Sequence, residues 1–249
     1  VGENTSDETL ARAFDYVQQI KKTPIVVNDS RGFFTSRVFA TYIDEGSLLL
    51  EEGLDPALIE NLGKAIGMPV GPLAVQDEVS QQLTVKANET NRELDARLGQ
   101  NVGADNAAYR LAKKMITEHQ RGGRAHGGGY YNYPEGGEKH LWPEIYNWYY
   151  KADVSLPVQD VKDRLLFRQI VESLRCFEEG VMNNVADSNI GSLMGIGFPP
   201  HTGGVFQFIN TYGLNRFVDR CNVLSEQYGE RFAPPQLLLD KAKKNELFV

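Results

Sequence analysis

The chain has 249 residues, of which 41% are hydrophobic, and a formal net charge of −7 at pH 7. This length allows one large domain or two small ones with packed cores. The acidic balance argues against nucleic acid and anionic membrane surfaces as partners, because both select for basic patches. No apolar run approaches the ~18 residues that a membrane span needs. The two cysteines, Cys176 and Cys221, lack metal-type or redox-type spacing, so we expect free thiols.

The first elements predicted along the chain are a helix, a strand and a second helix. A capping-box pattern of Thr5 and Glu8 opens the first helix, which runs to about residue 20. The β-branched run at 23–28 is typical of a strand. From about residue 33, apolar residues recur at helical spacing up to Gly53.

The rest of the chain is predicted to be largely helical. Asp55-Pro56 supplies an N-cap and a first helical residue, and GMPVGP at 67–72 breaks the chain again. A glycine-rich segment at 121–137 contains a Tyr-Tyr-Asn-Tyr-Pro run, which we interpret as a short extended segment on the surface. The predicted helices of this part cover 73–120 with an interruption at 98–103, then about 143–150, 157–179, 202–210, 214–228 and 235–246.

An internal repeat links the two halves of the chain at a constant offset in the sequence. Arg37, Glu45, Glu52 and Gly53 have counterparts in Arg164, Glu172, Glu179 and Gly180. Gly63 and Gly67 then match Gly191 and Gly195 after a one-residue insertion. Two duplicated helical repeats are the simplest explanation.

Glu45 and Glu172 lie on the apolar stripes of their predicted helices. A buried carboxylate must be hydrogen-bonded or neutral. We expect a structural acid that accepts backbone N–H groups from the loop beyond the helix. A catalytic acid or base is the alternative, although no histidine lies nearby in the sequence.

Several motifs that carry chemistry are not found. The glycine-rich segment is not followed by the Lys-Ser/Thr or spaced glycines of a phosphate loop, and no strand–GxGxxG–helix unit is present. The four histidines show no metal-ligand spacing, and no G-x-S-x-G elbow occurs. His201 is interpreted as part of a helix entry with Thr202 as N-cap.

Ser36 lies in the stretch NDSRGFFTSR, at the start of the second predicted helix. The first turn of a helix presents free N–H groups and the positive end of a dipole. A hydroxyl at this place can cap the helix, or it can hydrogen-bond a ligand carbonyl. The residues alone favour capping over a ligand contact.

Three motifs resemble one enzyme family. KTPIVVNDSRGFFTSR, followed by a long helix and GMPVGP, resembles the C-terminal part of the 3-hydroxyacyl-CoA dehydrogenases. GGYYNYPEGGEKHLWP and GFPPHTGGVFQFINTYG resemble stretches of the multifunctional fatty-acid β-oxidation proteins that fuse an enoyl-CoA hydratase to this dehydrogenase. Together they cover nearly the whole chain.

The resemblance implies a mainly α fold with two helical repeats, like the C-terminal domain of 6-phosphogluconate dehydrogenase. In the family an NAD-binding Rossmann domain comes first and carries the catalytic histidine. The expected division is 1–29 as the end of that NAD-binding domain, 30–150 as the first helical repeat and 151–249 as the second. The fragment alone is therefore expected to be inactive and to bind no cofactor, with NAD bound mainly by the missing domain.

The resemblance also implies site residues. The family's Asn, which contacts the substrate near the reacting carbon, corresponds to Ser36 in this sequence, so Ser36 is the candidate catalytic residue. Phe34, Gly71 and Pro72 are the other candidate substrate-binding residues. Serine offers one hydroxyl where asparagine offers an amide, so the family pattern is altered here.

The expected function is oxidation of 3-hydroxyacyl-CoA to 3-oxoacyl-CoA in fatty-acid β-oxidation. The partners implied are an acyl-CoA substrate, a second copy in a homodimer and a thiolase subunit, in the bacterial cytoplasm or in the mitochondrial matrix or peroxisome of a eukaryote. The alternative is a non-catalytic oligomerisation or docking module of a β-oxidation complex. No metal is expected.

Overall fold

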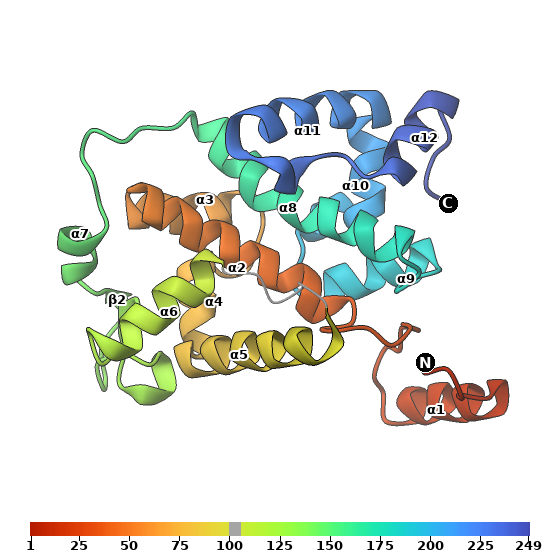
Figure 1. The fold of residues 1–249 in the computed structure, drawn as a ribbon, viewed down its shortest axis with the longest axis horizontal. Helices are drawn as coiled ribbons and strands as arrows, with labels where there is room; N and C mark the ends of the chain where they lie inside the picture. Colours follow the sequence, from red (N-terminus) through yellow and green to blue (C-terminus); the bar gives the residue numbers. More distant parts are fainter. Residues whose placement is uncertain (100–105) are drawn as a thin grey trace. The chain divides into compact units, whose positions relative to one another are not determined.

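The computed structural model describes residues 1–99 and 106–249 (Figure 1). These residues are mainly helical, and they form one two-stranded antiparallel sheet of β1 (Tyr131–Asn132) and β2 (His140–Leu141). The chain divides into two compact units. Unit 1 comprises residues 1–41 and 166–249, and unit 2 comprises residues 42–165.

Two long helices each contribute to both units, because the divisions fall inside them. They are α2 (Thr35–Glu52) and α8 (Val158–Glu178). The other helical elements of unit 2 are α3 (Pro56–Ala65), α4 (Pro72–Val79), α5 (Gln81–Leu98), α6 (Ala107–Thr117), η1 (Arg124–His126) and α7 (Glu144–Trp148). Those of unit 1 are α1 (Asp7–Gln19), α9 (Val185–Ile190), η2 (Gly191–Gly195), η3 (Pro200–Thr202), α10 (Val205–Tyr212), α11 (Leu214–Tyr228), η4 (Glu230–Phe232) and α12 (Gln236–Lys244).

The helix starts follow local capping chemistry. Asp55 caps α3 by accepting the Ala57 N–H at 2.7 Å, as predicted. The cap of α1 was predicted one residue too early, since Ser6, not Thr5, accepts the Thr9 N–H at 3.2 Å. Gly204, rather than Thr202, is the N-cap of α10.

Each unit contains a corner in which a polar side chain caps the next helix. In unit 2, Glu60 accepts the first-turn N–H groups of α4 from Leu73 and Ala74. In unit 1, Asn189 accepts the first-turn N–H groups of α10 from Phe206 and Gln207. A Cβ added to the glycine before either helix, Gly71 or Gly204, would lie 2.5 or 2.6 Å from that acceptor residue. The offset that relates Gly63 to Gly191 pairs Glu60 with Ser188, so the carboxylate and the amide that cap these helices do not occupy equivalent positions of the internal repeat.

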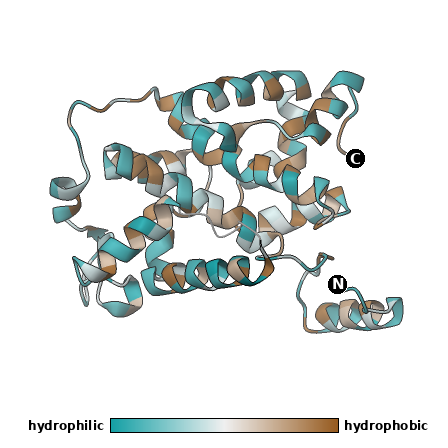
Figure 2. Cartoon of the chain, in the orientation of Figure 1, coloured by the Kyte–Doolittle hydropathy of each residue, from teal (hydrophilic) through white to brown (hydrophobic). Residues whose placement is uncertain are grey.

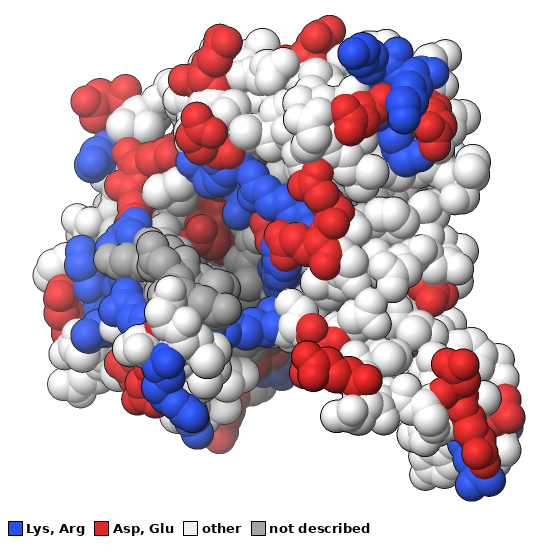
Figure 3. Space-filling view, turned by 45° about the vertical axis from the view of Figure 1, so that its right-hand side comes forward, with Lys and Arg blue, Asp and Glu red and all other residues white. Residues whose placement is uncertain are grey.

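Hydrophobic and hydrophilic residues are interspersed along the helices (Figure 2). In α6, Leu111, Ala112 and Met115 are buried, while Lys113 and Lys114 are exposed. Acidic and basic side chains are interspersed over the face drawn in Figure 3, and much of that face is neither. None of the described helices is long and apolar enough to cross a membrane.

Two of the sequence predictions differ from the structure, and a third falls largely on residues that it does not describe. Residues 23–28 pair with no strand in the described ranges; instead, the Asn28 N–H donates to the Val181 carbonyl at 2.9 Å. Helix α9 and the π-helical η2 were not predicted. The predicted interruption at 98–103 falls largely on residues 100–105, which lie outside the described ranges.

The tyrosine run after the glycines was expected on the surface, but Tyr130 and Tyr131 are buried. Asp77 of α4 explains this placement, because its carboxylate oxygens accept the N–H groups of both tyrosines at 2.9 Å. A Cβ on Gly129 would lie 1.8 Å from the Asp77 Oδ1 atom, so only glycine allows this approach. The glycine-rich segment therefore serves to wrap a buried carboxylate.

Candidate functional site

A tight turn leads into α2 at the position that the sequence singled out. Gly32 has φ +75° and Phe33 has φ +47°, and the turn is closed by hydrogen bonds from the Phe33 N–H to the Ser30 carbonyl and from the Arg37 N–H to the Gly32 carbonyl. A bulky residue in the left-handed region is strained. Such strain is common at functional sites, and Phe33 is also 49% exposed.

Ser36 is the second residue of α2, and it is exposed. Among the described residues, none hydrogen-bonds its hydroxyl, so Ser36 does not act as a helix cap there. Phe34, two residues earlier, is fully buried and anchors the turn in unit 1. The backbone N–H groups of Thr35 and Ser36 open the helix, where the macrodipole is positive. The turn thus presents a hydroxyl and a helix N-terminus on the surface.

An open pocket of about 310 Å³ lies in unit 1 beside this turn. Its lining is mostly apolar and comprises Thr23, Ile25, Val27, Phe33, Phe34, Thr35, Ile190, Gly191, Met194 and Gly195. Two glycines of η2 allow the close packing around it. A Cβ at Gly191 would lie 2.8 Å from Ile25, and one at Gly195 would lie 2.8 Å from Thr35. Met194 is 75% exposed and offers a flexible apolar side chain at the rim.

The segment that leads to the turn is tied to the C-terminal part of unit 1. The Val26 N–H donates to Asp187 Oδ2 at 3.1 Å. The Asn28 side chain donates to the Gly180 carbonyl at 2.7 Å, in addition to the backbone bond to Val181. Residues from the far end of the sequence therefore fix the approach to α2.

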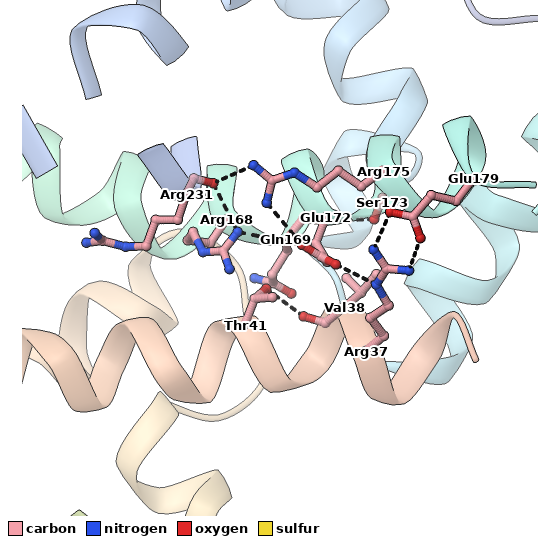
Figure 4. Close-up of polar contacts among 10 residues, drawn as sticks. All are labelled: Arg37, Val38, Thr41, Arg168, Gln169, Glu172, Ser173, Arg175, Glu179 and Arg231. Atoms are coloured by element: carbon pink, nitrogen blue, oxygen red, sulfur yellow. Dashed lines mark hydrogen bonds and ion pairs between the residues drawn. The ribbon is translucent and has the colours of Figure 1, made fainter. Parts of the chain in front are cut away.

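Arg37, which follows Ser36, is held by two glutamates of α8 and the residue after it (Figure 4). Its Nε atom donates to Glu172 at 2.5 Å, and its two Nη atoms donate to Glu179 at 2.5 and 2.9 Å. The hydrogen bond to Glu179 raises the pKa of Arg37 further above its ordinary value, and Arg37 in turn lowers the pKa of Glu179. Fork-shaped pairing of this kind fixes geometry as well as charge.

Unit 2 contains the counterpart of this cluster, built from the equivalent positions of the internal repeat. Arg164 donates from Nε to Glu45 at 2.6 Å and from its Nη atoms to Glu52 at 2.7 and 2.8 Å. Arg164 and Glu45 are both 0% exposed. Glu45 and Glu172 are structural acids, as expected, and each accepts an arginine Nε–H from the other repeat. Glu45 is buried and paired with Arg164, so nothing in its surroundings supports a role as a catalytic acid or base.

The remaining predicted site residues, Gly71 and Pro72, lie in unit 2 and are buried. Gly71 packs against the Glu60 carboxylate, and Pro72 packs so close to Gly46 that a Cβ there would lie 2.3 Å from the proline Cβ. These contacts explain both residues as parts of a corner. A substrate-binding role for them stays a prediction.

Two buried carboxylates in unit 2 have raised pKa values. Burial raises the pKa of Glu60, which also accepts a hydrogen bond from the Tyr131 hydroxyl at 2.7 Å. Burial likewise raises the pKa of Asp77. Each is surrounded by donors, which identifies it as a structural acceptor. Within the described ranges, no group of His, Cys, Asp or Glu could hold a metal ion.

Sequence reasoning found the turn but missed what holds it. Asp187 and Glu179 were not candidates for any role at the site, since each is far from Ser36 in the sequence. The repeat did carry a signal, because Arg37 and Glu179 match Arg164 and Glu52 at the same offset. The recurrence marked these arginines and glutamates as equivalent, but it did not tell which of them pair.

The chain is similar to one protein family and to several curated proteins. Residues 32–133 match the family described as 3-hydroxyacyl-CoA dehydrogenase, C-terminal domain. The chain is 34% identical over 251 residues to the fatty acid oxidation complex subunit alpha of Vibrio cholerae, and 34% identical over 249 residues to that of Shewanella oneidensis. Each match covers 98% of this chain and 34% of the relative, so the chain spans about a third of the length of these curated relatives.

Solved structures agree in fold. The crystal structure of 3-hydroxybutyryl-CoA dehydrogenase from Escherichia coli K12 has a TM-score of 0.73 at 17% identity, covering 98% of this chain and 66% of that one. The dehydrogenase part of multifunctional enzyme 1 from C. elegans has a TM-score of 0.67 at 26% identity, covering 96% and 54%. Residues 32–133, which include the strained turn before α2, thus match the C-terminal domain family of the 3-hydroxyacyl-CoA dehydrogenases, and the whole chain is similar to part of the fatty acid oxidation complex alpha subunits.

Proposed function

We propose that this chain is the substrate-binding part of an NAD-dependent (S)-3-hydroxyacyl-CoA dehydrogenase that oxidises 3-hydroxyacyl-CoA to 3-oxoacyl-CoA in fatty-acid β-oxidation. The family match and the names of the relatives support the reaction class. The observation that carries the assignment of the site is Ser36. Its hydroxyl is exposed at the start of α2 and is not used as a cap, and the preceding residues Phe34 and Thr35 line an apolar pocket.

The turn before α2 offers groups that can bind the substrate oxygen on the reacting carbon. The Ser36 hydroxyl can donate a hydrogen bond to that oxygen, and the N-terminal dipole of α2 favours negative charge there. The pocket lined by Ile25, Phe33 and Met194 offers apolar surface to the acyl portion of the substrate. Phe34 is buried beneath the turn and also lines this pocket, which supports its proposed role in substrate binding.

The described residues do not fit a dinucleotide. Their only sheet has two strands of two residues, and the glycine-rich segment wraps Asp77 instead of opening a helix. Hydride transfer to NAD is therefore not a step that these residues carry out by themselves. NAD would be bound mainly by an NAD-binding domain outside residues 1–249.

Helix α1 supports the assignment of residues 1–29 to an NAD-binding domain. None of its residues is buried, although Leu10, Phe14 and Val17 form an apolar face. Tyr16 is 62% exposed. An amphipathic helix gains its stability by packing that face on a core, so we propose that α1 packs on the rest of that domain.

The relatives are named as subunits of a complex, which supports the proposed partners. We propose a homodimer that docks a thiolase subunit, located in the cytoplasm of a bacterium. A purely structural role in such a complex is the competing function. It predicts an assembled but inactive protein.

The test compares this chain with a form extended upstream to include an NAD-binding domain. Each is assayed for NADH formation from 3-hydroxyacyl-CoA, and its mass in solution is measured. We expect activity in the extended form and none in this chain. An extended form that assembles and binds NAD but does not oxidise the substrate would refute the enzyme assignment and favour the structural module.

A further inference from the structure

We infer that Glu172 and Glu179 are positioning residues for Ser36, acting through Arg37. This inference rests on the proposed function of Ser36, and it gives the second repeat a part in that site. The two glutamates belong to the second repeat by sequence, whereas the turn with Ser36 opens the first. Both lie in unit 1 with the turn.

The contact set is suited to fixing a helix start. Arg37 uses three of its N–H groups on the two glutamates, and all three distances are between 2.5 and 2.9 Å. The Arg37 side chain is 21% exposed and that of Glu172 is 11% exposed, so solvent competes weakly for the bond between them, whereas that of Glu179 is 51% exposed. Arg175 also donates to Glu172, at 3.3 Å, and holds the carboxylate from the other side (Figure 4).

Such a tie is needed because the turn itself is strained. Phe33 adopts a left-handed conformation that costs free energy, and its ring is half exposed. Ser36 caps nothing, so its own side chain does not stabilise the turn. Arg37 is the next residue, and a forked arginine fixes the rotation of this first turn and thereby the direction of the Ser36 hydroxyl. Small displacements of a reacting group are costly, with about 1 Å corresponding to a loss on the order of 100-fold in rate.

The internal repeat supplies a matched control. In unit 2, Arg164 pairs with Glu45 and Glu52 through the same atoms. Glu52 and Glu179 are also alike in exposure, at 34% and 51% of the side chain. The residue that corresponds to Ser36 by the offset is Asp163, which is buried and accepts a hydrogen bond from Gln159. The same cluster thus exists a second time without an exposed hydroxyl beside it.

The experiment uses the extended, NAD-binding form of the enzyme and four variants: Glu179→Gln, Glu52→Gln, Ser36→Ala and the double variant S36A/E179Q. Each glutamine removes a charge and one fork acceptor, so we expect similar small falls in Tm for both. Only Glu179→Gln should lower kcat, by about 10-fold, the rate equivalent of one displaced hydrogen bond. KM should change less than kcat, because the loss falls on the transition state.

The double variant separates positioning from general damage. Once Ser36 has lost its hydroxyl, misplacing residue 36 should matter little, so S36A/E179Q should have the kcat of Ser36→Ala alone. Losses that multiply would overturn the inference, as would equal kcat in Glu179→Gln and Glu52→Gln. An unchanged kcat in Ser36→Ala would refute the proposed function of Ser36 itself. An impaired Ser36→Ala beside a fully active Glu179→Gln would refute only the positioning role.

Discussion

Glu45→Met removes the acceptor of the Arg164 Nε–H in the core of unit 2. Both residues are 0% exposed, and the donor–acceptor distance is 2.6 Å. Burial by itself lowers the pKa of Arg164, but hydrogen bonds and charges from Glu52 and Glu45 raise it on balance, so the guanidinium stays charged. Breaking a buried ion pair from one side costs about 3–5 kcal/mol. Because Glu52 still compensates the charge, we expect about 3 kcal/mol here, which is roughly 6–12 °C in Tm for a chain of this size.

The partner variant and the double variant complete the cycle. Arg164→Met leaves the Glu45 carboxylate buried without its arginine and should cost about 3–5 kcal/mol. The double variant replaces the pair by apolar side chains of similar length, while Glu52 is already 34% exposed. We therefore expect the double variant to cost about 1–2 kcal/mol, well below the sum of the single costs.

Urea unfolding followed by circular dichroism measures these free energies, provided that the m-values agree among the variants. Glu178→Met serves as a control for the same change of side chain outside the core. Glu178 lies on the exposed side of α8, where its carboxylate accepts a hydrogen bond from the Leu237 N–H. Single costs below about 1 kcal/mol, or costs that simply add, would refute the reasoning that this pair is buried and coupled.

Three further predictions concern stability and reactivity. Gly46→Ala would place a Cβ 2.3 Å from the Pro72 Cβ, so it should lower the free energy of unfolding by about 2–4 kcal/mol. The control is Gly2→Ala, whose Cβ would lie 3.8 Å from its nearest atom and should leave that free energy nearly unchanged. Burial raises the pKa of Glu60 above its ordinary 4.5, so its contribution to stability is fully present below pH 4.5 and is lost as pH rises through the folded-state value. Glu60→Gln should flatten that part of the pH dependence of unfolding, and an unaltered slope would contradict it. Burial also raises the pKa of Cys176 to about 12, so iodoacetamide should modify this thiol only in urea; rapid labelling of the native chain would show that it is exposed.

Local chemistry made much of the helical order predictable. Asp55-Pro56 starts α3 because capping depends on residues within one turn. The helix at 214–228 was predicted with the bounds that the structure has. Ser6 instead of Thr5 caps α1, since two neighbouring hydroxyls satisfy the same pattern.

Long-range partners set the limit of prediction. Tyr130 and Tyr131 are buried because Asp77, which lies far earlier in the sequence, accepts their N–H groups. Residues 23–28 have the composition of a strand, but a strand needs a neighbour with which to pair, and the described ranges supply none.

The candidate site follows the same rule. The sequence identified the turn at Ser36 from its local pattern and from a family resemblance. It did not indicate that Glu172 and Glu179 hold Arg37, because that pairing joins residues 135 and 142 positions apart. The constant offset of the repeat identified equivalent positions but did not tell which of them touch.

The proposed role of the Ser36 hydroxyl is tested most directly by the steady-state oxidation of 3-hydroxyacyl-CoA. The rates of the extended enzyme with and without this hydroxyl are compared. If that hydroxyl faces the substrate oxygen, Ser36→Ala should lower kcat/KM by about 10–100-fold, which corresponds to one hydrogen bond lost in the transition state. Because Ser36 is exposed and caps nothing, its Tm should stay within about 1 °C of the parent. A variant with the parent's kcat/KM would contradict the account.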